Sequence, residues 1–261
     1  MPELPDLEVF KVNIFNRLTS KHLIGCAVYN LNKVNMPQAV MQSELIGRDL
    51  EGVDRGGKEL LFRFSGGKVV SAHLMLNGEV SVVTGEAAVA AIRFKIFSMG
   101  FENETVVFSD RGGLCTIRLN PVPSRTPDAF GADFTLDYWL RTARGKSRDN
   151  IKAFLIDQKI VRGIGNAYAD EILWAARVSP RSTVGRIPEE KMAELYSSIG
   201  SVLRGAIDSI KAVKPDIISG EERGFLKVHN KMLKQTATGH AIVVENIASK
   251  ITYYTDEQTL Y

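Results

Sequence analysis

Cysteine is scarce in this chain, and Cys26 and Cys115 are the only two among 261 residues. Two cysteines cannot form a disulfide framework or a four-cysteine zinc site, and they favour a reducing compartment. Long apolar runs are also missing, since no stretch approaches the roughly 18 residues that a membrane span needs. Asp6 and Glu8 lie where a signal peptide would be basic and then apolar. We therefore expect a soluble, cytoplasmic protein with no membrane partner.

The chain also has little excess charge. Lysine and arginine number 33, aspartate and glutamate number 30, and the formal net charge is +3. Any affinity for a polyanion must therefore come from clustered basic residues rather than from the total charge. With 44% hydrophobic and 24% charged residues, the chain can bury a sizeable core. These values exclude a disordered or fibrous protein, and the length allows one or two domains.

The hydrophobic pattern divides the chain into a β-rich part and a helical part. Apolar residues at helical spacing predict a first helix over residues 5–18. Short β-type runs then predict strands at 24–29, 59–64, 68–74, 91–97, 105–108 and 114–119. Beyond a linker at 120–124, helical spacing predicts helices at 136–142, 150–158, 166–176 and 189–209. Alternation at 240–244 and 250–255 predicts a final hairpin, so we expect a β-sandwich followed by a helical part.

The first residues combine an amine nucleophile with a carboxylate. Proline in position two permits removal of Met1, which would leave Pro2 as a free secondary amine beside Glu3. An α-amino group titrates near pH 7.7–8.0 and lysine near 10.4, so more of the α-amine is unprotonated at neutral pH. Such an amine can attack an aldehyde, and Glu3 could move protons. The alternative is that these residues merely start a helix.

Further candidates lie along the chain as separate, individually weak signals. The loop Gly163-Ile164-Gly165 leads into the helix expected from Asn166, its predicted N-cap. Backbone N–H groups and the helix dipole at such a place suit a phosphate, although many glycine turns before helices are only structural. Lys58, Lys152 and Lys250 are isolated basic residues, and each taken alone is typical of a solvated surface.

Taken together, these segments resemble the Fpg/Nei (formamidopyrimidine-DNA glycosylase/endonuclease VIII) family of DNA repair enzymes. The resemblance covers nearly the whole chain, and three segments carry it: Met1-Pro2-Glu3-Leu4-Pro5, Arg55-Gly56-Gly57-Lys58-Glu59-Leu60-Leu61, and Asp157 through Glu171. It implies an α+β protein of two domains, with a leading helix and β-sandwich followed by a helical domain that contains a helix-two-turns-helix motif. It also implies that damaged double-stranded DNA binds between the domains with one nucleotide flipped out.

The resemblance assigns roles to individual residues. It implies that Pro2 attacks C1′ of the damaged nucleotide, that Glu3 moves protons, and that Lys58, the third catalytic residue, grips a phosphate near the lesion. The resulting iminium would permit β,δ-elimination, so the implied activity is a bifunctional DNA glycosylase and AP lyase acting on oxidised or ring-opened bases. The residues implied to bind DNA are Lys152, Gly165, Asn166, Tyr168, Glu171 and Lys250. No cofactor is expected, and the protein is expected to act as a monomer, at the nucleoid if it is bacterial.

The stretch that would form the family's zinc finger departs from the pattern. Residues 224–258 contain none of the usual four cysteines, and His229 and His240 cannot replace four ligands, so we expect no metal and interpret both as surface histidines. The alternation near the C-terminus resembles the family's zincless finger, a β-hairpin. Lys250 stands where the family usually has a phosphate-clamping arginine, and lysine keeps the charge but loses the bidentate fork.

The residues expected to fill the space of the flipped base also differ. Leu76 replaces an intercalating methionine, and Gly113 and Leu114 stand where relatives have arginine and phenylalanine. We expect Leu76 and Leu114 to act as the wedge, with Arg111 as a shifted substitute. The connection at 216–224 is shorter than the lid of 8-oxoguanine-preferring relatives, which favours hydantoins and formamidopyrimidines as substrates.

These predictions divide the chain into a catalytic domain at 1–123, a helix-two-turns-helix domain at 124–223 and a zincless finger at 224–261. A different function remains open beside the enzyme. The changes at Lys250, Gly113 and Leu114 are also those of a catalytically weak or inactive protein that binds lesions or abasic sites without turnover. Covalent trapping on an abasic site distinguishes the two hypotheses.

Overall fold

The first helix begins beside the N-terminus and is capped by its own carboxylates. In the computed structural model, which describes residues 1–261, α1 runs over Leu4–Arg17 with Glu3 as its N-cap. Glu3 and Asp6 form a capping box, in which the backbone N–H of Glu3 donates to Asp6 Oδ2 at 2.8 Å. This reciprocal pairing satisfies N–H groups that the first helical turn leaves without intrahelical partners.

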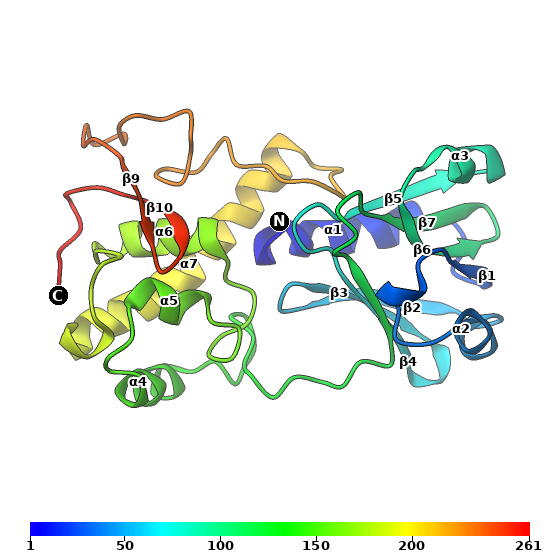
Figure 1. Cartoon of the computed structure of the whole chain (residues 1–261), viewed down its shortest axis with the longest axis horizontal. Helices are drawn as coiled ribbons and strands as arrows, with labels where there is room; N and C mark the ends of the chain where they lie inside the picture. The colour runs from blue at the N-terminus through cyan, green and yellow to red at the C-terminus, as the bar shows by residue number, and fades with distance from the viewer. The chain divides into compact units, whose positions relative to one another are not determined.

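Two antiparallel four-stranded sheets follow α1 (Figure 1). One has the order β1 (Leu23–Val28), β6 (Lys95–Phe101), β7 (Glu104–Ser109), β5 (Glu79–Thr84). The other has the order β2 (Leu50–Gly56), β3 (Glu59–Phe64), β4 (Lys68–His73), β8 (Thr116–Leu119). Alternate side chains of the strands share one hydrophobic core, and the rings of Phe62 and Phe108 meet edge to face with centroids 5.6 Å apart. The sandwich thus follows from the period-two pattern.

Several local predictions in this region were wrong. The expected strand at 91–97 is not continuous. The helix α3 (Glu86–Ala91) ends at the residue where that strand was expected to begin, and β6 starts only at Lys95. The alanine-rich sequence Glu86–Ala91 favours a helix, and Phe94, at φ 55°, turns the chain into β6. Four helices and strands were not predicted at all, namely α2 (Gln38–Leu45), α3, β2 and β5.

The rest of the chain is mainly helical and ends in a hairpin. Its elements are α4 (Leu136–Gly145), α5 (Ile151–Ile156), α6 (Asn166–Ala175), α7 (Glu189–Val213), β9 (Val243–Ile247) and β10 (Lys250–Tyr254). Short 3₁₀ turns lie at Leu31–Lys33, Ser65–Gly67 and Val184–Arg186. Trp139 is fully buried and packs on Phe154 with ring centroids 4.9 Å apart. The two turn residues of the hairpin, Ala248 and Ser249, both have positive φ, as a two-residue hairpin turn requires.

The residues group into two compact units. The first consists of Met1–Pro123 with Ile210–Glu221, and the second of Ser124–Ser209 with Glu222–Tyr261. This differs from the expected three segments, because residues 224–261 belong to the second unit and the end of α7 belongs to the first. The α+β fold class is as predicted, and no helix is long and apolar enough to cross a membrane.

The shared core of the sandwich gives a first prediction. Phe62→Ala removes a fully buried ring from the contact with Phe108 and should lower the free energy of unfolding by about 3–5 kcal/mol. Urea unfolding followed by circular dichroism measures this change. Leu31→Ala, at a side chain that is 66% exposed, is the matched control and should stay within about 0.5 kcal/mol. Equal effects of the two substitutions would contradict the proposed core.

Candidate functional site

The N-terminal segment lies in the first unit, against the start of α1. Pro2 and Glu3 are both buried, and Glu3 is held in place by the capping box. The ammonium group of Met1 forms an ion pair with the carboxylate of Glu221. The position that would carry the nucleophilic amine is therefore fixed by a helix cap on one side and a carboxylate on the other.

Lys58 lies in the tight turn between β2 and β3 of the same unit. Gly57 has φ 60°, which this turn requires. Arg55 secures the turn: its Nη1 donates to the carbonyl of Gly57 at 3.0 Å, and its Nε pairs with Glu8 Oε1 of α1 at 2.7 Å. The ion pair ties the lysine-bearing turn to α1, the helix that Glu3 caps.

The two predicted wedge residues are exposed on loops of the first unit. Leu76 is 57% exposed and Leu114 is 39% exposed. The Leu114 loop is folded around the buried carboxylate of Asp110, which accepts N–H groups from Gly112, Leu114 and Cys115 at 2.6–2.7 Å. The two loops adjoin, since a Cβ on Gly112 would lie 3.6 Å from the Asn77 side chain. The exposure of Leu76 and Leu114 and the proximity of their loops suit a wedge, and this role stays a prediction. Sequence reasoning missed Asp110, which organises the Leu114 loop.

In the second unit, a loop between two helices is held by a glutamine amide. Gln158 donates to the carbonyls of Ile156 and Ile164 and accepts the N–H of Gly163, whose φ is 104°. The loop delivers the chain to α6, whose N-cap is Gly165 rather than the predicted Asn166. Asn166 instead donates its side-chain amide to the carbonyl of Ile251 in β10 at 2.9 Å, and its Oδ1 has no hydrogen-bond partner.

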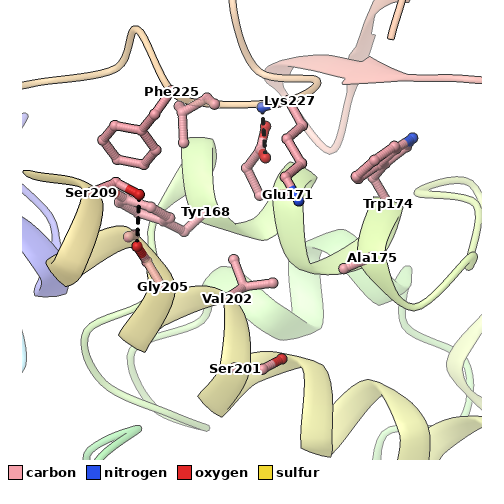
Figure 2. Close-up of a pocket in the computed structure, with 12 residues that line it drawn as sticks. Tyr168, Glu171, Trp174, Ala175, Ser201, Val202, Gly205, Ser209, Phe225 and Lys227 are labelled. Carbon is pink, nitrogen blue, oxygen red and sulfur yellow. Dashed lines mark hydrogen bonds between the residues drawn. The ribbon is translucent and has the colours of Figure 1, made fainter. Parts of the chain in front are cut away.

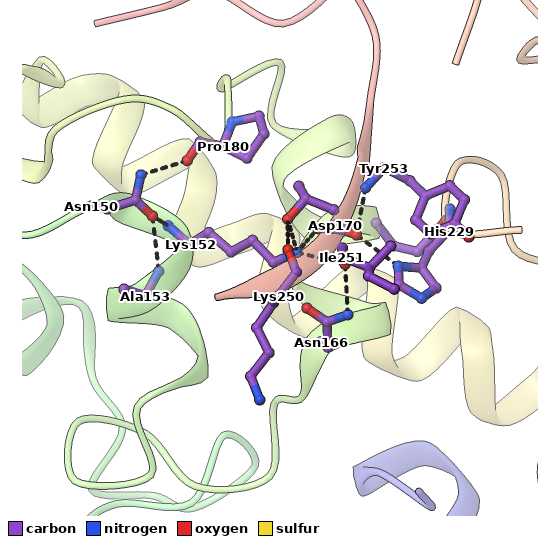
Figure 3. Close-up of polar contacts among 12 residues, drawn as sticks. Asn150, Lys152, Ala153, Asn166, Asp170, Pro180, His229, Lys250, Ile251 and Tyr253 are labelled. Atoms are coloured by element: carbon purple, nitrogen blue, oxygen red, sulfur yellow. Dashed lines mark hydrogen bonds and ion pairs between the residues drawn. The ribbon is translucent and has the colours of Figure 1, made fainter. Parts of the chain in front are cut away.

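A buried ion pair joins α5, α6 and the hairpin (Figure 3). Lys152 and Asp170 are both inaccessible to solvent, with Nζ 2.7 Å from Oδ1. Lys152 also donates to Thr252 Oγ1 at 2.6 Å, and the other Asp170 oxygen accepts the N–H of Tyr253 at 2.9 Å. This burial disagrees with the predicted phosphate contact of Lys152, because its ammonium is occupied inside the protein.

His229 completes this cluster. Its Nδ1 lies 2.6 Å from Asp170 Oδ2, and its ring packs on Tyr253 with centroids 4.6 Å apart. The prediction of an ordinary surface histidine was therefore wrong for His229, whereas His240 is exposed beside Asp256. The sequence alone does not indicate this contact, since Asp170 and His229 are 59 residues apart.

Glu171 holds the loop that follows α7, and its predicted contact with DNA stays a prediction. Its carboxylate is buried and accepts the backbone N–H groups of Lys227, Val228 and His229 at 2.7–3.0 Å. Burial raises the pKa of Glu171, and the three N–H groups oppose that shift. This carboxylate lies in the wall of a pocket of about 370 Å³ between α6, α7 and residues 225–227 (Figure 2).

Tyr168 and Lys250 have opposite environments. Tyr168 is fully buried, with the guanidinium of Arg223 5.1 Å from its ring centre, and its side chain lines the pocket. Lys250 is exposed at the first position of β10, and its side chain extends away from the buried ion pair (Figure 3). Of the two lysines predicted to bind DNA in this unit, Lys152 is buried and Lys250 is accessible.

Comparison with known proteins finds matches to both units. Residues 1–116 match the model of the formamidopyrimidine-DNA glycosylase N-terminal domain, and residues 126–214 match that of the formamidopyrimidine-DNA glycosylase H2TH domain. A formamidopyrimidine-DNA glycosylase of Carboxydothermus hydrogenoformans is 30% identical over 241 residues, which cover 88% of this chain and 89% of the relative. The chain belongs to the formamidopyrimidine-DNA glycosylase family.

Other members of the family agree with this assignment. The formamidopyrimidine-DNA glycosylase of Cytobacillus firmus is 31% identical over 219 residues, 80% of this chain and 79% of the relative. The solved complex of Lactococcus lactis Fpg with DNA containing an abasic site has a TM-score of 0.87 at 23% identity, covering 99% of this chain and all of that one. A complex of the same protein with FAPY-dG containing DNA has a TM-score of 0.85 at 24% identity, covering 98% of this chain and all of that one. These structures establish the fold.

The residues of this family member do not fit a zinc site. Both cysteines are buried in the first unit, and burial raises their pKa values to about 11 for Cys26 and about 12 for Cys115. The structure has no group of three or more histidine, cysteine or acidic side chains arranged to hold a metal ion. The hairpin is held instead by the cluster around Asp170 and by Glu257, which accepts from Trp174 and Thr238 and pairs with Arg177.

The buried ion pair gives a prediction for the second unit. Asp170→Asn leaves the Lys152 ammonium buried without its counter-ion and should lower the free energy of unfolding by about 3–5 kcal/mol. Both tryptophans, Trp139 and Trp174, belong to this unit, so urea unfolding followed by tryptophan fluorescence reports on it.

Two further variants separate charge burial from general damage. The double variant Lys152→Met with Asp170→Leu should be more stable than Asp170→Asn, because no charge is then buried alone. Asp208→Asn on the exposed side of α7 is the matched control. A loss below about 1 kcal/mol for Asp170→Asn would show that the ion pair does not hold this unit together.

Proposed function

We propose that this protein is a monomeric DNA glycosylase of base excision repair that also cleaves the strand as an AP lyase. The observation that carries the proposal is the buried, capped Pro2–Glu3 start of α1 in a chain of this family. The relatives and solved structures, named for formamidopyrimidine-DNA glycosylase and for DNA with abasic or FAPY-dG lesions, support damaged DNA as the substrate. The proposal assigns nucleophilic chemistry to the first unit and DNA anchoring to both.

The proposed nucleophile is the amine of Pro2 after Met1 has been removed. The Pro2 nitrogen attacks C1′ of the damaged nucleotide, and the base departs with the electrons of the glycosidic bond. Opening of the sugar ring leaves a C1′ iminium on Pro2, whose positive charge makes the C2′ proton acidic and permits β-elimination, then δ-elimination. Glu3 is buried beside this amine and is the carboxylate proposed to move protons in these steps.

The proposed anchors are the exposed Lys250 and the turn lysine Lys58. The buried residues Lys152, Glu171 and Tyr168 support them indirectly, by holding the hairpin and the loop after α7. Leu76 and Leu114 are proposed to fill the space of the extruded nucleotide, which offsets part of the unstacking cost of a few kcal/mol. The short connection after α7 favours bulky oxidised bases such as hydantoins and formamidopyrimidines.

The alternative is a lesion-binding protein without turnover. Lys250 replaces an arginine fork, and Gly113, with φ 62°, offers no side chain to the orphaned base. Both changes weaken anchoring while leaving Pro2 and Glu3 intact, so they predict reduced catalysis rather than its absence.

Covalent trapping tests the proposed function. Protein shown by intact mass to lack Met1 is incubated with duplex DNA carrying one abasic site, and borohydride is added. We expect a covalent adduct that peptide mapping places on Pro2, because borohydride reduces the iminium to a stable amine. Protein expressed with Met1 retained is the matched control and should give no adduct, since its Pro2 nitrogen is an amide. Binding without an adduct in the Met1-free protein would favour the lesion-binding alternative.

Salt dependence tests the role of Lys250. Lys250→Ala should weaken binding to DNA with an abasic-site analogue and lower the slope of log Kd against log salt by about one. Lys250→Arg should keep the slope and raise the yield of trapped adduct, because the guanidinium can contact a phosphate through two N–H groups. Lys211→Ala at an exposed position of α7 serves as the control. An unchanged slope for Lys250→Ala would exclude a phosphate contact at this position.

A further inference from the structure

The segment Lys214–Glu221, here called the strap, belongs to the first unit and is bound to α1 and β5 of that unit. The side-chain amide of Asn13 in α1 donates to the carbonyls of Pro215 and Ile217 at 2.7 and 2.8 Å. Ser219 Oγ accepts the N–H of Val80 in β5 at 3.1 Å. Ile218 is 8% exposed and belongs to the core of the sandwich. The strap therefore has a defined path, and this path ends at Glu221.

The carboxylate of Glu221 lies at the N-terminal amine. It pairs with the ammonium group of Met1, and the two residues are 220 positions apart in the sequence. The nitrogen atoms of Met1 and Pro2 are separated by three covalent bonds and thus by at most about 3.7 Å. Glu221 is 35% exposed at its side chain, so it can rotate toward an amine that moves by this distance when Met1 is removed.

We propose that Glu221 is a positioning residue for the Pro2 amine, holding it at the start of α1 in the orientation from which it attacks C1′. This inference rests on the proposed function and adds a residue to it. Glu221 forms no bond to DNA and acts only through the amine. A carboxylate beside the amine also favours the ammonium form, so Glu221 raises the pKa of the nucleophile while it orients it.

Other charged groups belong to the elements around this amine. Glu3 and Asp6 lie at the start of α1, Lys58 lies in the β2–β3 turn, and the Arg55–Glu8 pair joins that turn to α1. Lys214 begins the strap and Arg17 of α1 donates to the carbonyl of Asp216. All of them are left unchanged in the test, so a difference between variants reports on the carboxylate of Glu221 alone.

The test uses Met1-free full-length protein and two measurements. The pKa of the Pro2 amine is obtained by NMR of protein labelled with ¹⁵N and ¹³C in proline. The rate of borohydride trapping on abasic-site DNA is measured from about pH 5.5 to 9.5, a range that includes the ordinary pKa of an α-amine. Wild type, Glu221→Gln, Glu221→Asp and the control Glu102→Gln are compared. Glu102 is exposed in the turn between β6 and β7.

Glu221→Gln should lower the pKa of the Pro2 amine by about half a unit, as expected for a partly exposed pair. The acidic limb of the trapping profile should then move to lower pH by the same amount. At high pH, where the amine is already neutral, the rate should fall about threefold or more because the amine is no longer held in place. Glu221→Asp should restore the pKa, and Glu102→Gln should match wild type in both measurements.

An amine pKa and a trapping profile for Glu221→Gln that both match wild type would overturn the inference, even if the wild type forms its adduct on Pro2. Equal loss of rate at every pH, with an unchanged pKa, would also overturn it, because that pattern indicates general damage to the fold. If the wild type forms no adduct, the proposed function fails. The NMR pKa then still decides whether Glu221 holds the amine.

Discussion

The buried ion pair between Lys152 and Asp170 is the interaction on which the second unit depends. It joins α5 to α6, and through Thr252, Tyr253 and His229 it also fixes β10 and the loop after α7. Removing two charges from water costs several kcal/mol each, so such a pair is retained only where its geometry and hydrogen bonds are nearly complete. Here each Asp170 oxygen is 2.6–2.9 Å from a nitrogen of Lys152, His229 or Tyr253. The pair thereby specifies which way the hairpin docks on α6.

This cluster has the role that a metal ion has in a zinc finger. A zinc site organises a small hairpin by tying distant ligands to one centre. In this chain the carboxylate of Asp170 is that centre, and its partners come from α5, β10 and the loop at His229. For the proposed function, the consequence is that Lys250, two residues before Thr252, projects from a strand whose position is fixed. A hairpin without either centre would leave that lysine on a mobile loop, at a greater entropic cost on binding DNA.

The sequence predicted the parts of this fold that local pattern determines. Helical spacing identified α1 and α6, and β-branched alternation identified the final hairpin within a few residues. β2, whose sequence has no clear period, was missed because its stability comes from the neighbouring strand of its sheet. The DNA-binding motif was found, but the environments of its residues were not. Nothing in the sequence distinguishes an exposed Lys250 from a buried Lys152, because burial of a lysine depends on a carboxylate supplied from another helix.

Two glutamates with opposite solvation anchor the chain after α7. Glu221 ends the strap of the first unit at the N-terminal amine, and Glu171 captures the N–H groups of Lys227, Val228 and His229 in the second unit. Glu171 is buried and makes three hydrogen bonds to backbone that cannot rotate away, so it specifies a single loop path. Glu221 is partly exposed and pairs with the N-terminal amine, which in the proposed function becomes that of Pro2, so its contact would have to tolerate movement. A buried carboxylate therefore fixes the loop geometry, whereas the partly exposed Glu221 suits the proposed function, in which its partner amine moves toward a reacting atom.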